Sequence, residues 1–103
     1  MKDFVSFDLQ SELSEEQVFA CLTQFLKAFV WRRGDSDMQG PYIYGSSKDS
    51  VQINLWLGER PIAMSVSFRR AWPNVPNRET LKKELIDLIT SRVIPSIGRI
   101  AAG

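Results

Sequence analysis

Residues 51–68 read VQINLWLGERPIAMSVSF, and this stretch decides the fold class. Apolar residues alternate with polar residues on both sides of the connector Gly58-Glu59-Arg60-Pro61, which is the pattern of two half-buried strands. The connector is short and contains turn-forming Gly and Pro, so we expect the two strands to pair antiparallel. Tyr42-Ile43-Tyr44 precedes them as a third, shorter strand after a loop over residues 34–41. Together these segments predict an antiparallel meander with one apolar face.

A strand and a helix are expected before the meander. Residues 4–9 alternate between apolar and polar side chains, as in a strand with one buried face. Ser14 is followed three positions later by Gln17, which is the pattern of a helix capping box. Apolar residues then recur at helical spacing from Val18 to Val30. We expect this helix to end at Gly34, which can take a left-handed cap conformation.

A second helix is expected after the meander, with Asn77 as its N-cap and with Pro95 ending or kinking it after Ile94. The element order is then β-α-β-β-β-α. It predicts an α+β two-layer sandwich, in which a mostly antiparallel four-stranded sheet carries two helices packed on one face. We expect a single domain over residues 1–103, with a core at about 3–94 and a C-terminal tail at 95–103.

The composition excludes several chemistries. The 103 residues contain no histidine and one cysteine, Cys21. Ser-His-Asp and Cys-His catalysis, His-ligated zinc and intramolecular disulfides are therefore ruled out. No glycine-rich phosphate loop and no CxxC motif is present. We expect a protein that is not an enzyme and that has no cofactor.

Two acidic residues are the weak candidates for a metal site. Asp35 and Asp37 open a stretch that resembles the beginning of a calcium-binding loop, with Gly40 at the position of the sharp turn. Gln39 stands where a further Asp or Asn belongs, and Ser46 stands where the loop needs a bidentate Glu. Asp side chains also bond their own backbone in ordinary turns, so we expect no metal here.

The face of the sheet that is turned away from the helices is the candidate binding surface. The residues that we expect on it to contact a partner or ligand are Phe4, Tyr42, Tyr44, Trp56 and Arg69. Aromatic side chains are unusual on a sheet face left to water. Three explanations remain open: a second copy covers the face in a homodimer, the C-terminal tail covers it, or it holds a ligand or another protein. We expect a protein-interaction module, working as an adaptor, chaperone-like binder or neutralising partner, that is homodimeric through this face.

A basic region is the basis of a weaker alternative, nucleic-acid binding. It consists of Arg69, Arg70, Arg78, Lys82 and Lys83. Residues 14–94 follow the element order of double-stranded-RNA-binding domains, α-β-β-β-α, but residues 72–76 replace the glycine-containing loop of those domains. The formal net charge of +1 also lacks the excess of Lys and Arg that nucleic-acid binders carry.

Small-ligand binding is the other alternative, with Trp31, Trp56 or Trp72 stacking on an organic molecule. The longest apolar run, Ala28-Phe29-Val30-Trp31, cannot span a bilayer, so we expect no membrane association. The single cysteine and the acid at position 3 favour a cytoplasmic protein without a secretory signal.

Overall fold

The computed structural model describes residues 4–38, 40–47, 51–58, 61–68 and 78–100. The strands are β1 (Phe4–Gln10), β2 (Val30–Ser36), β3 (Gly40–Ser46), β4 (Val51–Trp56), β5 (Ile62–Phe68) and β6 (Arg99–Ile100). The helices are α1 (Glu15–Phe25), α2 (Arg78–Leu88) and α3 (Ile94–Ile97), and a π-helical turn, η1 (Ile89–Val93), joins the last two.

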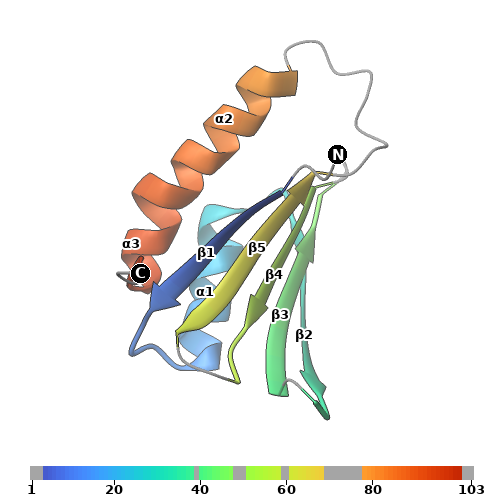
Figure 1. Ribbon diagram of the computed structural model, residues 1–103, viewed down its shortest axis with the longest axis vertical. Helices are drawn as coiled ribbons and strands as arrows, with labels where there is room; N and C mark the ends of the chain where they lie inside the picture. Colours follow the sequence, from blue (N-terminus) through green and yellow to red (C-terminus); the bar gives the residue numbers. More distant parts are fainter. Residues whose placement is uncertain (1–3, 39, 48–50, 59–60, 69–77, 101–103) are drawn as a thin grey trace.

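The strands form one antiparallel sheet in the order β2-β3-β4-β5-β1-β6. The helices α1 and α2 lie on the same side of the sheet, so the molecule has two layers (Figure 1). The α+β class and the antiparallel sheet are therefore confirmed. The predicted number of strands is wrong, because the sheet has six strands and not four.

The additional strand β2 occupies residues that the sequence assigns to the end of the first helix. The capping box is present, with Ser14 Oγ accepting from Gln17 N and Gln17 Oε1 accepting from Ser14 N. The helix nevertheless ends at Phe25, and Val30–Ser36 pairs with β3 along seven positions. A seven-residue ladder, begun by β-branched Val30 and aromatic Trp31, outweighs the helical spacing of the apolar residues. Four strands now separate the two helices, so the element order of double-stranded-RNA-binding domains is not followed.

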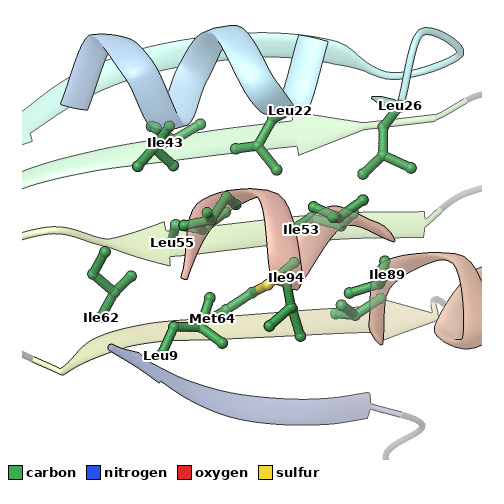
Figure 2. Packing of buried hydrophobic residues seen from close by; sticks show 14 of the residues in the cluster. Leu9, Leu22, Leu26, Ile43, Ile53, Leu55, Ile62, Met64, Ile89 and Ile94 are labelled. Carbon is green, nitrogen blue, oxygen red and sulfur yellow. The ribbon is translucent and has the colours of Figure 1, made fainter. Parts of the chain in front are cut away.

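The core lies between the sheet and the helices. Alternate residues of β4 and β5 are buried, as their pattern predicts, and Leu22 of α1 and Ile89 of η1 pack against them (Figure 2). The largest fully buried side chains are Leu9, Val18, Leu22, Ile43, Ile53, Leu55, Ile62, Met64, Val66, Ile89 and Val93. All are apolar, which agrees with a core whose formation is driven by the removal of hydrocarbon surface from water.

Pro95 does not end the helix that contains it. Its ring would collide with the carbonyl four residues earlier in a regular α-helix. The π-helical turn Ile89–Val93 widens the backbone just before the proline, and the helix continues to Ile97. Hydroxyl groups of this stretch donate to carbonyls one turn earlier in the chain: Thr90 Oγ1 donates to Ile86 O (2.9 Å) and Ser96 Oγ donates to Arg92 O (2.8 Å).

Gly98 lets the chain cross close to β1 and add β6 at the sheet edge. A Cβ at this position would lie 1.9 Å from the carbonyl oxygen of Gln10. Ser11 Oγ donates to Ile97 O (2.6 Å), and Arg99 Nε donates to Gln10 Oε1 (3.0 Å). The described part of the C-terminal segment therefore lies against the end of β1, and it does not cover the outer face.

Candidate functional site: the outer face of the sheet

Five strands contribute to the outer face, and their register arranges its residues in three rows. The rows run from β2 to β1 as Gly34-Tyr42-Trp56-Ala63-Asp8, Arg32-Tyr44-Asn54-Ser65-Ser6 and Val30-Ser46-Gln52-Ser67-Phe4. Only Arg32 and Asp8 of these residues carry a charge. The helices lie on the other side of the sheet, so the described chain leaves these rows uncovered.

The aromatic residues gather at one corner of this face. Tyr42 and Trp56 are direct cross-strand partners, and their ring centroids lie 5.4 Å apart with a tilt of 51° between the rings. Tyr44 follows in the next row beside Arg32. We call Tyr42, Tyr44, Trp56 and Arg32 the aromatic corner. Three of its members are half-buried and Arg32 is exposed, so the rings pack on one another and still offer apolar surface.

Gly34 allows the aromatic corner to reach the edge of the sheet. A Cβ at Gly34 would lie 2.4 Å from both Cζ and Oη of Tyr42. The hydroxyl end of Tyr42 therefore lies over the backbone of β2, in space that any other residue would fill. Aromatic side chains that cover a cross-strand glycine in this way protect the exposed backbone of the strand.

The structure brings together only some of the predicted residues. Phe4 lies on the same face and is 52% exposed, but one row and the strand β5 lie between it and Trp56. Arg69 lies outside the described residues. Arg32 was not among the predicted residues, because the helical spacing up to Val30 predicted that it lies near the end of a helix. Hydropathy offers no signal for it, because Val30 and Trp31 are both apolar and Arg32 and Arg33 are both charged, and it is the pairing with β3 that places Arg32 on this face.

The basic region is not part of the outer face as far as the structure describes it. Lys82 Nζ lies 5.4 Å from the centre of the Phe68 ring, and Phe68 is buried on the helix side of the sheet. Lys83 is exposed on α2. Arg69 and Arg70 lie outside the described residues, and only the backbone of Arg78 is described, at the start of α2. The two described lysines therefore lie in the helical layer.

The acidic candidates lie on a β-hairpin. Asp35 is in β2 opposite Pro41, and Asp37 is in the turn that follows. Among the residues with described positions, no group of three or more His, Cys, Asp or Glu side chains is arranged to hold a metal ion. The strand β3 thus occupies the positions at which a calcium-binding loop would continue.

The tryptophans differ in what they offer a ligand. Trp31 faces the helical layer, where its Nε1 donates to Leu26 O (3.1 Å) and its ring stacks on Phe29 at 5.7 Å between centroids. Trp31 therefore closes the end of the sandwich. Trp56 lies on the outer face, and Trp72 is outside the described residues. Of the three, Trp56 is the described tryptophan that a molecule on the outer face can reach.

A hollow that no sequence pattern indicated lies beside the end of β1. It has a volume of about 730 Å³ and is lined by Gln10, Ser11, Glu12, Leu13, Pro61, Ile97, Gly98 and Arg99. One acid and one base lie in its wall, and the polar groups of Ser11, Gln10 and Arg99 bond within the chain. These bonds fasten the C-terminal segment to β1, and we assign the hollow no ligand.

The sequence matches no known protein-family model, and no curated protein matches it significantly. No helix formed by the described residues is long and apolar enough to cross a membrane. The chemistry of the surface is therefore the basis for a functional proposal.

Proposed function

We propose that this chain is a non-enzymatic protein-interaction module and that it binds another polypeptide through the aromatic corner. The observation that carries the proposal is the pair Tyr42 and Trp56, which lies on the face of the sheet opposite the buried side chains of Ile43 and Leu55. Adaptor, chaperone-like and neutralising proteins all work through such a contact surface. The lone cysteine and the absence of histidine are consistent with binding in the cytoplasm and without catalysis.

The composition of the corner supports a protein as the occupant. Tyr, Trp and Arg are the residue types that dominate binding energy at protein interfaces. The neighbouring positions are small or uncharged, including Ala63, Ser65 and Asn54. A partner can therefore approach the rings without desolvating a dense set of charges, which is costly.

A second copy of the chain is the first occupant to test, since the sequence favours self-association through this face. Two outer faces stacked on each other would form a two-sheet sandwich and would bury both aromatic corners. If the partner is a different protein, the purified chain alone would not self-associate through this face. The alternative is that the corner binds a small molecule stacked on Trp56 and binds no protein.

The variant Trp56→Asp tests the proposal, because it places a charge at the centre of the corner. Ser67→Asp is the matched control, with the same introduced charge on the same face but two rows away. The measurements are molar mass by light scattering over a concentration series and recovery of bound protein by the tagged chain. We expect Trp56→Asp alone to lower self-association or protein recovery by ~10-fold or more, as loss of an interface anchor does. A folded Trp56→Asp chain that matches the wild type in both measurements would overturn the proposal.

A further inference from the structure

The strand β2 is an open edge of the sheet. It is seven residues long and pairs with β3 on one side, while no other described strand pairs with its outer edge. Its register with β3 is uninterrupted, it contains no proline, and Val30 is 62% exposed. At the opposite edge, β6 already pairs with Leu9 and Gln10, so the part of β1 without a described neighbouring strand on that side is shorter, residues 4–8. A long, regular edge of this kind is a template for another strand.

We propose that two copies of this chain pair antiparallel through β2, with Gly34 of each copy on the two-fold axis, and form one continuous sheet. This inference does not depend on what occupies the outer face. It concerns the hydrogen-bonding edge of the sheet, whereas the proposed function concerns side chains that project from the face.

The order of charges in β2 selects this register. A two-fold axis perpendicular to the sheet pairs residues at equal distances before and after the central residue. With Gly34 at the centre, Arg33 of each copy lies opposite Asp35 of the other, so the attractive pair occurs twice. Centring the pair on Arg32, Arg33 or Asp35 instead places two like charges directly opposite each other. Repulsion in those registers gives the pairing its specificity.

The exposure of these side chains is consistent with the pairing. Arg33 and Asp35 are both exposed, and they lie on the same face of β2 two residues apart. A second copy thus reaches both charges without removing either one from a buried site. The register about Gly34 leaves five residues of each copy, Arg32 to Ser36, directly paired.

The same register joins the two aromatic corners. The hydroxyl end of Tyr42 lies over Gly34, and neighbouring strands are about 4.8 Å apart. With the two Gly34 residues on adjacent strands, the two Tyr42 rings meet across the axis, and each continues to Trp56 of its own copy. The paired sheet therefore has one strip of four aromatic rings across its centre.

A charge exchange tests the proposal. Arg33→Asp leaves two carboxylates facing each other in both pairs, and Asp35→Arg leaves two guanidinium groups facing each other in both pairs. Each variant alone therefore has two repulsive pairs, whereas a mixture of the two variants restores two attractive pairs. Arg92→Asp, an exposed position on η1, is the matched control for loss of a positive charge. Because Arg33 also lies 5.1 Å from the centre of the Phe19 ring, restoration in the mixture is the decisive result.

The measurement is molar mass by light scattering at equal protein concentrations, with circular dichroism to confirm folding. We expect each single variant to have half the mass of the wild type and a dissociation constant raised ~10-fold or more, while the mixture and Arg92→Asp keep the wild-type mass. A wild type that is monomeric at the highest concentration would overturn the proposal. So would single variants that associate as the wild type does, or a mixture that stays at half mass. Arg33 and Asp35 lie on the face of β2 opposite the aromatic corner, so restoration in the mixture tests the edge separately from Trp56→Asp, and failure of one proposal is distinguishable from failure of the other.

Discussion

The indole ring of Trp31 lies against the backbone of Gly45 on the neighbouring strand, where a Cβ would come within 2.5 Å of Cε3 and Cζ3. The indole nitrogen donates to Leu26 O at the end of α1 (3.1 Å). On the other face of the same two strands, Tyr42 covers Gly34. Each of β2 and β3 therefore contributes one glycine and one aromatic ring that covers the glycine of its neighbour.

Replacing each of the two glycines by alanine should lower the free energy of unfolding by different amounts. We expect Gly45→Ala to lower the free energy of unfolding by about 1–3 kcal/mol, since the ring that it meets is fixed by a hydrogen bond and by packing. Gly34→Ala should cost less, because it meets only the far end of Tyr42, which can turn toward solvent. Urea unfolding of both variants checks the order. Equal losses would show that Trp31 moves as freely as Tyr42.

The capping box of α1 should show coupling between its two side chains. Ser14→Ala removes the acceptor for Gln17 N and should cost about 1 kcal/mol of stability. Gln17→Ala removes the acceptor for Ser14 N. A double-mutant cycle measured by urea unfolding should give a loss for the pair that differs from the sum of the single losses. Strict additivity would contradict a reciprocal box.

Leucines on the two long helices should differ in their contribution to stability. Leu22 of α1 is fully buried, whereas Leu81 near the start of α2 is 40% exposed. We expect Leu22→Ala to cost about 2–5 kcal/mol and Leu81→Ala to cost less than about 1 kcal/mol. Thermal and urea unfolding of the two variants provide the comparison. A large loss for Leu81→Ala would mean that the start of α2 packs more tightly than its exposure indicates.

The crossing of the C-terminal segment over β1 should depend on Gly98. We expect Gly98→Ala to destabilise the chain by about 1–3 kcal/mol, since its Cβ meets a backbone oxygen that no side-chain rotation can move. Ile100→Ala, in the adjacent strand, is the control, because Ile100 is 51% exposed and its truncation should cost little. Amide hydrogen exchange at Gln10 would report the loss of β6. Unchanged protection in Gly98→Ala would contradict the close approach.

Local patterns were sufficient for part of this fold. The start of α1 follows from Ser14 and Gln17, which are three positions apart and bond directly. The alternation in β4 and β5 also predicted which residues are buried. The strand β2 could not be predicted in this way, because Phe29 and Val30 fit the helical spacing, and only pairing with β3 decides against it. The strand β6 has two residues, too few for any periodic signal.

The candidate site could also be predicted in part, again because residues alternate between the two faces of a strand. Alternation determines the face of a strand residue, and Tyr42, Tyr44 and Trp56 accordingly share one face. Alternation does not determine the order of strands, and the position of β1 beyond β5 separates Phe4 from these rings. Arg32 joins the corner only because residues 30–36 form a strand. The predicted place of Arg69 lies outside the described residues.

The position of β1 between β5 and β6 has a consequence for how the chain reaches its native state. Gln10 and Arg99, which bond across this edge, are 89 positions apart in the sequence. Contacts between distant segments slow folding, because the intervening chain must be ordered before they form. The strands β2, β3, β4 and β5 can pair as consecutive hairpins, but β1 can pair only after β5 is in place, and β6 can pair only after β1. We therefore expect the first strand of the chain to be among the last to be fixed in place, after the meander has formed.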